Sequence, residues 1–106
     1  MYQVIFVMPD GQSRTVTVAA GESVMDAALD HLIPGIKAQC GGAITCSTCH
    51  CYVDNAWVSR IPPAGELEKT MLEYVWQPRK NSRLCCQLVM DANLDGIVVH
   101  VPVRQG

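Results

Sequence analysis

The spacing of the cysteines constrains this chain more than any other feature. Cys40, Cys46 and Cys49 lie close together, and two adjacent cysteines, Cys85 and Cys86, follow far downstream. Three clustered thiols with one distant thiol suit an iron-sulfur cluster, which cysteine thiolates hold. A zinc ribbon instead uses two separated C-x2-C knuckles. The sequence therefore predicts a cluster with four thiolate ligands.

The residues between the first three cysteines favour a [2Fe-2S] centre. The pattern C-x5-C-x2-C followed by a distant cysteine differs by one residue from the plant-type C-x4-C-x2-C arrangement. Backbone N–H groups must approach the inorganic sulfides closely to hydrogen-bond to them. Small residues permit that approach, and the intervening positions are rich in them: Gly41, Gly42, Ala43, Ser47 and Thr48.

Three stretches of the chain resemble one known family. The run from Cys40 to His50, CGGAITCSTCH, is similar to the signature of the adrenodoxin and putidaredoxin family of [2Fe-2S] ferredoxins. The stretch NSRLCCQ at 81–87 resembles the segment that carries this family's fourth ligand, and LDGIVV at 94–99 resembles the closing strand of its bacterial members. The resemblance implies a single [2Fe-2S] ferredoxin domain over residues 1–106, with the α+β, β-grasp ferredoxin fold.

Spacing alone does not choose between the two adjacent cysteines. In an extended segment neighbouring side chains point to opposite sides, so only one of Cys85 and Cys86 can face the cluster. The family carries its ligand directly before a glutamine, which corresponds to Cys86 before Gln87. The resemblance therefore implies one [2Fe-2S] cluster whose iron ligands are Cys40, Cys46, Cys49 and Cys86.

The remaining cysteines are expected to have no part in the cluster. Cys51 falls where the family has apolar residues, so we interpret it as a small buried hydrophobic side chain. Cys85 is then a spare thiol. His50 follows a predicted ligand, and we expect its ring to hydrogen-bond near the cluster loop and link that loop to the second helix.

Composition restricts the class of protein. Its 106 residues suit one domain, and a hydrophobic content of 49% excludes disorder. No apolar run approaches the length of a membrane span, and a net charge of −2 disfavours a nucleic-acid partner. The opening residues lack the pattern of an export signal, so we expect the protein in the reducing cytoplasm, where clustered cysteines bind metal. We also expect it to be a monomer.

Hydrophobic periodicity predicts a mixed sheet with a helix packed on one face. Val4, Phe6 and Met8 alternate with Ile5 and Val7, and the stretch 14–18 alternates again after an Asp10-Gly11 turn, which indicates a hairpin. Ser23, with Asp26 three residues later, predicts the start of a helix that runs to Pro34. A second helix is expected over 66–75 with Leu67, Met71 and Val75 buried, and strands over 51–53, 88–90 and 97–99.

A cluster with four cysteine ligands has no open coordination position, so the expected function is electron transfer and not catalysis. The resemblance implies that electrons come from an FAD-dependent NAD(P)H ferredoxin reductase. It implies delivery to a haem-thiolate monooxygenase of the cytochrome P-450 class. We expect docking around Gln39, Ile44, Thr45 and the mixed-charge helix over 66–73, where Glu66, Glu68 and Glu73 stand with Lys69.

Three other functions are compatible with parts of the sequence. A ferredoxin of the same fold can supply electrons for iron-sulfur cluster assembly. A structural zinc-binding interaction module is disfavoured by the cysteine spacing. A metal-free β-grasp interaction module would make the four cysteines a coincidence.

Overall fold

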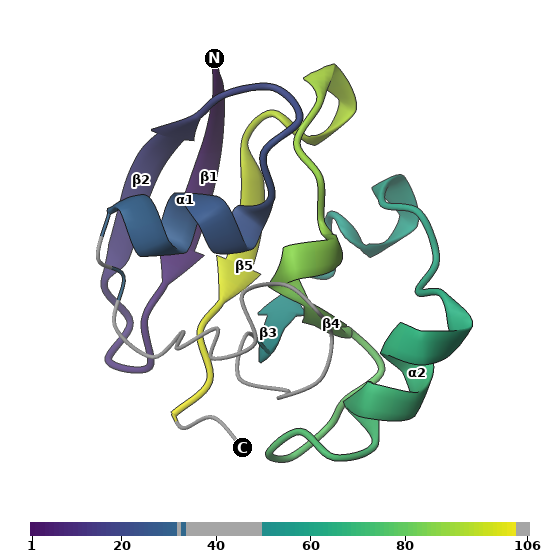
Figure 1. Cartoon of the computed structure of the whole chain (residues 1–106). Helices are drawn as coiled ribbons and strands as arrows, with labels where there is room; N and C mark the ends of the chain where they lie inside the picture. The colour runs from purple at the N-terminus through teal and green to yellow at the C-terminus, as the bar shows by residue number, and fades with distance from the viewer. Residues whose placement is uncertain (32, 34–49, 104–106) are drawn as a thin grey trace.

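A computed structural model describes residues 1–31, 33 and 50–103. Within these residues the chain forms one five-stranded sheet in the order β2-β1-β5-β3-β4 (Figure 1). The strands are β1 (Tyr2–Val7), β2 (Ser13–Val18), β3 (His50–Val53), β4 (Ser82–Leu84) and β5 (Ile97–His100). β1 and β5 run parallel and the other neighbours antiparallel. The predicted mixed sheet is confirmed.

The opening hairpin forms as predicted. Tyr2 pairs with Val18 and Val7 with Ser13, and Gly11 in the turn has a φ of 90° that favours glycine. Because side chains alternate along a strand, Val4 and Phe6 are fully buried on the inner face.

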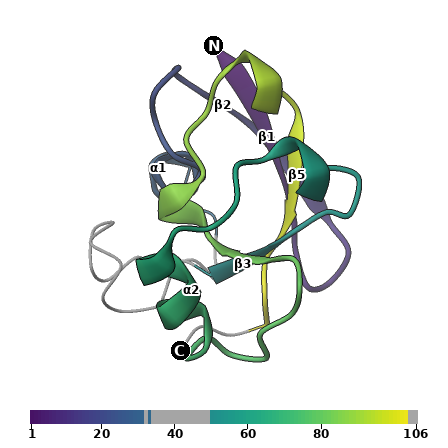
Figure 2. The same ribbon diagram turned by 90° about the vertical axis from the view of Figure 1, so that its right-hand side faces the viewer.

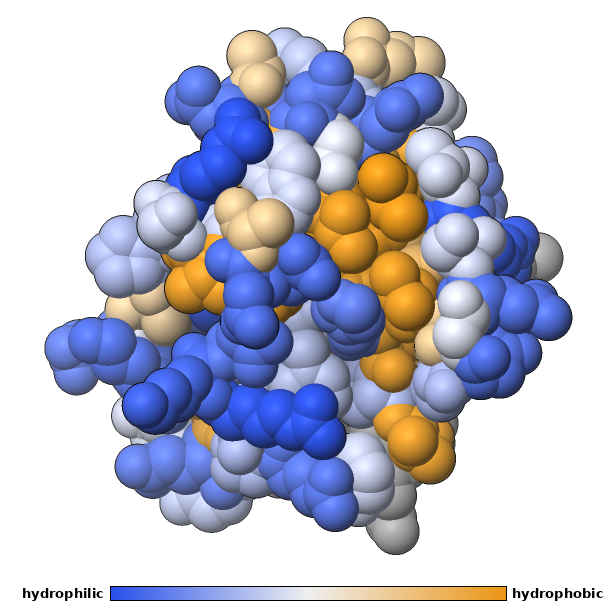
Figure 3. Space-filling view, turned by 180° about the vertical axis from the view of Figure 1, so that it is seen from behind, coloured by the Kyte–Doolittle hydropathy of each residue, from blue (hydrophilic) through white to orange (hydrophobic). Residues whose placement is uncertain are grey.

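The outer face of the sheet is also partly apolar. Ile5 and Val7 of β1 and Val98 of β5 are half-buried there, and Ile5 lies beside Val98 in the parallel register. Figure 3 shows a hydrophobic band on this side of the molecule, over β1 and β5. The two faces of the sheet therefore differ in burial, and only the inner one is fully covered.

The first helix, α1 (Val24–Asp30), begins at the predicted cap. The Ser23 hydroxyl accepts the N–H of Asp26 at 3.0 Å, and the Asp26 carboxylate accepts the N–H of Ser23 at 2.9 Å. The helix buries Val24 and Ala28 against the sheet, crossing in front of β1 and β2 in Figure 1 and lying to one side of them in Figure 2.

α1 ends earlier than predicted, at Asp30 instead of Pro34. His31 caps it, and contacts with β2 hold that end in place. The His31 ring lies 3.1 Å from the Thr17 carbonyl oxygen, and Arg14 donates to the His31 carbonyl at 3.3 Å. These non-local contacts compete with further helical hydrogen bonds. Within the described residues, no helix is long and apolar enough to cross a membrane.

The second helix, α2 (Glu66–Leu72), lies beyond β4 at the opposite end of the sheet from β2 (Figure 1). It is shorter than the predicted 66–75, and the prediction that Leu67 is buried was wrong. Leu67 is 56% exposed, whereas Glu68 is only 2% exposed. Met71 is half-buried and Val75 is buried beyond the end of the helix. The buried side of α2 is therefore centred on a carboxylate.

A bidentate ion pair explains this orientation. The Glu68 carboxylate accepts from Arg83 Nε at 2.7 Å and from Arg83 Nη2 at 3.0 Å. The same carboxylate accepts the backbone N–H of Leu84 at 2.9 Å. Arg83 Nη1 also donates to the Pro62 carbonyl at 2.6 Å. One pair of side chains thus joins α2, the segment before it and β4.

The strand that we predicted over 88–90 does not form. The chain instead makes a short 3-10 helix, η2 (Cys85–Gln87), followed by an isolated bridge between Ser23 and Val89. Val24 N–H donates to the Leu88 carbonyl, and Met90 N–H donates to the Glu22 carbonyl, both at 2.8 Å. The start of α1 therefore takes the backbone hydrogen bonds that a sheet neighbour would have made.

Among the residues that the structure describes there are two further 3-10 helices, η1 (Val58–Arg60) and η3 (Ala92–Leu94). Between β3 and η1, Asp54 accepts from His100 Nε2 at 2.9 Å and from the Ala56 N–H at 3.2 Å. The His100 hydrogen bond, with that of Ala56, holds the pKa of Asp54 below its usual value of 3.8. This contact therefore stabilises the fold above that pH and is lost as the pH falls through the lower folded-state pKa.

We predict that Glu68→Gln strongly destabilises the protein. The amide keeps the shape of the side chain but leaves the buried Arg83 guanidinium without its counter-charge. Removing one partner of a buried pair costs about 3–5 kcal/mol. Urea unfolding of the purified holoprotein, followed by far-UV circular dichroism, measures the change.

Glu66→Gln is the matched control, because Glu66 is on the same helix but exposed. Its unfolding free energy is expected to stay within about 0.5 kcal/mol of the parent. Equal unfolding midpoints for the two variants would show that the buried pair does not hold α2 in place.

Candidate metal centre

Three of the predicted ligands, Cys40, Cys46 and Cys49, lie outside the described residues, as do Gln39, Ile44 and Thr45. The structure does describe the residue that follows Cys49 and the strand that leads to Cys86. His50 begins β3 and pairs with Leu84, two residues before Cys86, at the end of β4. Because the two strands are antiparallel, the start of β3 and the end of β4 lie side by side at the same end of the sheet.

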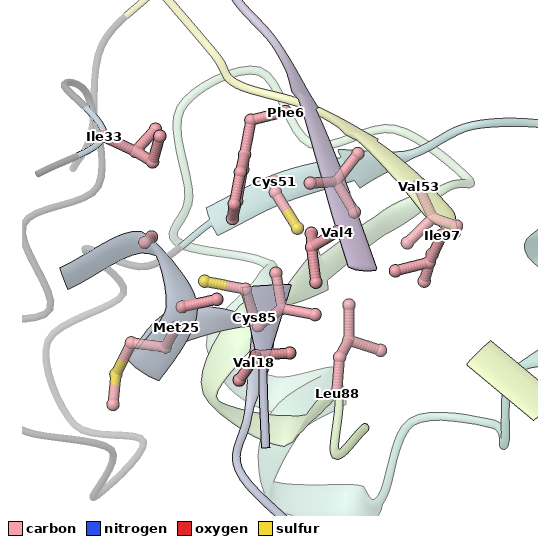
Figure 4. Packing of buried hydrophobic residues seen from close by; sticks show 14 of the residues in the cluster. Val4, Phe6, Val18, Met25, Ile33, Cys51, Val53, Cys85, Leu88 and Ile97 are labelled. Atoms are coloured by element: carbon pink, nitrogen blue, oxygen red, sulfur yellow. The ribbon is translucent and has the colours of Figure 1, made fainter. Parts of the chain in front are cut away.

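The adjacent cysteines occupy different environments. They lie in η2, not in the extended segment that we assumed, and still differ in burial. Cys85 is fully buried, whereas Cys86 is partly exposed and packs against the outside of the core. Figure 4 shows the Cys85 sulfur among apolar side chains of the core. Of these two cysteines, Cys86 is the one that lies at the margin of the core.

Cys86 also has a polar neighbour. Gln87 Nε2 lies 3.4 Å from Cys86 Sγ, in hydrogen-bonding range for sulfur. A donor aimed at a sulfur atom stabilises negative charge on it, as a ligating thiolate requires. The side chain directly after Cys86 thus suits a thiolate ligand chemically.

Cys51 belongs to the core, which confirms the interpretation made from the sequence. It is fully buried in β3 and lies in the same hydrophobic cluster as Val4, Phe6 and Cys85 (Figure 4). Its neighbours are apolar, so its burial contributes to packing in the manner of other small hydrophobic residues.

The side chain of His50, in β3, contacts β4 at this end of the sheet. The ring is fully buried, with Nε2 2.8 Å from the Ser82 hydroxyl and the ring edge against Tyr52 at a centroid distance of 4.6 Å. The Ser82 hydroxyl also accepts the N–H of Arg79 at 2.8 Å. The contact to Ser82 leads to β4, and the expected link between the cluster loop and the second helix stays a prediction, because that loop lies outside the described residues.

Sequence reasoning did not identify Glu68 and Arg83 as structural residues of this region. Arg83 directly precedes the Leu84-Cys85-Cys86 run, and its ion pair fixes the strand that carries these residues. The signal was the isolated Arg83 next to an otherwise apolar run. A charged residue there needs a buried counter-charge, although the sequence does not say which carboxylate supplies it.

Comparisons with known proteins agree with this arrangement. Residues 7–91 match the family model described as a 2Fe-2S iron-sulfur cluster binding domain. The chain is 49% identical to putidaredoxin from Pseudomonas putida and 43% identical to rhodocoxin from Rhodococcus erythropolis. Each alignment covers 99% of both sequences.

The fold agrees as closely as the sequence. A crystal structure of a reduced cysteine-to-serine variant of Pseudomonas putida putidaredoxin superposes with a TM-score of 0.95 at 48% identity, covering 98% of this chain and 99% of that one. The predicted β-grasp fold and the single [2Fe-2S] cluster are thereby confirmed. The chain belongs to the putidaredoxin-type [2Fe-2S] ferredoxins, proteins that transfer electrons through a bound cluster and are not enzymes.

Proposed function

We propose that this ferredoxin carries single electrons from an FAD-dependent NAD(P)H ferredoxin reductase to a cytochrome P-450 type monooxygenase. The similarity to putidaredoxin over the full length carries this proposal. A further solved match, at 47% identity and a TM-score of 0.92 over 96% of this chain, is the covalent complex of putidaredoxin reductase with putidaredoxin. The reductase partner is inferred from that complex and the monooxygenase from the family.

The proposed cluster ligands are Cys40, Cys46, Cys49 and Cys86. The burial of Cys85 in the core, the exposure of Cys86 at its margin and the pairing of His50 with Leu84 support this set. When bound, the cluster supplies a one-electron change of oxidation state with all iron positions taken by sulfur. The chain's own residues position the Cys86 thiolate and shield the core beneath it.

The exposed side of α2 is the proposed docking surface among the described residues. Glu66 and the apolar Leu67 are exposed on α2, and Glu73 and Tyr74 are exposed directly after it. Glu68, which we had included in this surface, is buried in its ion pair and unavailable. Two carboxylates beside two apolar side chains suit a weak interface in which charge accelerates encounter.

Service in iron-sulfur cluster assembly is the second candidate. An ISC-like [2Fe-2S] ferredoxin from Pseudomonas putida matches at 31% identity with a TM-score of 0.81 over the whole of this chain. The corresponding values for putidaredoxin are 48% and 0.95. The larger similarity to putidaredoxin favours the monooxygenase pathway. We further propose that the carrier works as a monomer in the cytoplasm, where Cys51 stays reduced.

The adjacent cysteines provide the sharpest test of the ligand set. Cys86→Ser is expected to lose the cluster or to hold it with a shifted visible spectrum, because serine offers iron an oxygen ligand in place of a soft thiolate. Cys85→Ser is expected to keep two irons and two sulfides per chain. Iron and acid-labile sulfide analysis, with visible and low-temperature EPR spectra, measures both.

Cys51→Ala is the control for a buried cysteine outside the ligand set. Its spectrum should be unchanged, with a stability loss of about 1 kcal/mol for a small buried side chain. A colourless Cys85→Ser protein beside a normal Cys86→Ser protein would contradict the assignment and place the ligand at Cys85.

Reduction by putidaredoxin reductase and NADH tests the docking surface. Stopped-flow rates should fall as salt rises, since screening acts over roughly 8 Å at physiological ionic strength. Replacing both Glu66 and Glu73 with glutamine should flatten this salt dependence and leave the visible spectrum unchanged. Glu22→Gln, a change of charge at the start of α1, should behave as the parent protein does. Rates indifferent to salt and to both exposed glutamates would exclude charge steering by α2.

The monooxygenase step separates the two candidate functions. Chemically reduced protein should transfer its electron to a P-450 of the organism that encodes it, with appearance of the ferrous carbonyl haem spectrum. If the reduced protein instead gives its electron to an iron-sulfur cluster assembly system with a cysteine desulfurase, and reduces no P-450 of that organism, the cluster-assembly function is favoured.

A further inference from the structure

A cleft between η1, α2 and β4 gathers half of the chain's basic residues. Of the eight lysines and arginines in the sequence, four line this cleft: Lys69, Arg79, Lys80 and Arg83. None of the ten aspartates and glutamates lines it. The chain as a whole has a net charge of −2, so the cleft is a local region of opposite sign. Its volume is about 540 Å³.

The floor of the cleft is apolar. Val53 is fully buried at its base, Ile61 and Leu72 are half-buried along its sides, and Val58 is 40% exposed. Pro62 and Pro63 complete the lining between η1 and α2. Cavities of roughly 300–1,000 Å³ accept compact apolar groups in proteins. The floor therefore offers a place for an apolar side chain from outside.

The rim carries cations that no described carboxylate neutralises. Among the described residues there are two ion pairs, Arg83 with Glu68 and His100 with Asp54. Neither pair includes Lys69, Arg79 or Lys80. All three are exposed. Lys69 projects from α2, and the other two belong to the segment that precedes β4. Positive charge thus borders the apolar floor on two sides.

Arg79 is held in position before any partner arrives. Its guanidinium lies over the Tyr52 ring, 4.3 Å from the ring centroid. The Tyr52 hydroxyl in turn donates to the Gln77 carbonyl at 2.8 Å. A cation fixed by a ring contact loses less side-chain entropy on binding an anion.

We propose that this cleft docks an acidic segment of a protein partner, with one apolar side chain inserted and carboxylates on either side of it. Cations on both walls of an apolar floor match that order of groups, and the match of opposite charges favours encounter. The inference rests on the proposed carrier function, since it assigns the contact to one of the carrier's partners. The bound segment would lie against β4, where Arg83 is three residues from Cys86.

The probe is a five-residue peptide with a central leucine and two acidic residues on each side, blocked at both ends. Titrated into ¹⁵N-labelled holoprotein at low salt, it should shift the backbone amides of residues 58–61, 64 and 79–83 saturably. A peptide of equal length with the four carboxylates replaced by amides is the first control. It should produce shifts at these residues that are much smaller at every concentration.

Substitutions then separate the cleft from general charge attraction. Lys69→Gln and Lys80→Gln should each raise the dissociation constant about twofold to fivefold, the range of single exposed ion pairs. Arg14→Gln makes the same change in net charge on β2, outside the cleft, and should leave the constant within about twofold. An Arg14→Gln effect as large as the lysine effects, or equal binding of the neutral peptide, would overturn the proposal.

The titration needs neither a reductase nor a monooxygenase. Holoprotein that accepts one electron from dithionite but shows no saturable shifts at these residues would overturn the cleft assignment and leave the carrier function standing. Loss of the carrier function would instead appear in the reductase and P-450 assays.

Discussion

The buried ion pair between Glu68 and Arg83 is the contact on which the cluster-bearing half of the molecule depends. Four hydrogen bonds converge on it, from α2, the Pro62 segment and the backbone of β4. Desolvating two charges is costly, and only good geometry with further hydrogen bonds offsets that cost. This pair has both. Its benefit is therefore specificity, since few other arrangements of these segments would satisfy the same groups.

β4 is where the apolar core, the candidate metal centre and the basic cleft meet. Arg83 reaches toward α2 and lines the cleft, Leu84 is fully buried, and the chain then enters η2. Within one turn of that helix Cys85 points into the core and Cys86 lies at its margin. Packing of one cysteine thus orients the next, because the short helix leaves little freedom to rotate one side chain independently of the other.

Local features of the fold could be predicted from the sequence, and non-local ones could not. The hairpin and the Ser23 cap depend on residues within a few positions, so their patterns are sufficient. The inner face of α2 depends on Arg83, fifteen residues further along, and apolar spacing pointed to Leu67 instead of Glu68. The strand predicted at 88–90 failed for the same reason, since its hydrogen bonds go to the residues around Ser23. The cysteine pattern was informative because cluster chemistry restricts ligand type and spacing regardless of the surrounding fold.

The parallel pairing of β1 with β5 determines when this protein can finish folding during synthesis. The N–H of Gln3 donates to the Asp95 carboxylate, a contact between residues 92 positions apart. Contacts this distant are slow to form, because a long loop must close before they stabilise the chain. β5 also lies in the middle of the sheet, between β1 and β3. A nascent chain on the ribosome therefore exposes the unpaired edge of β1 until β5 has been made and can pair with it.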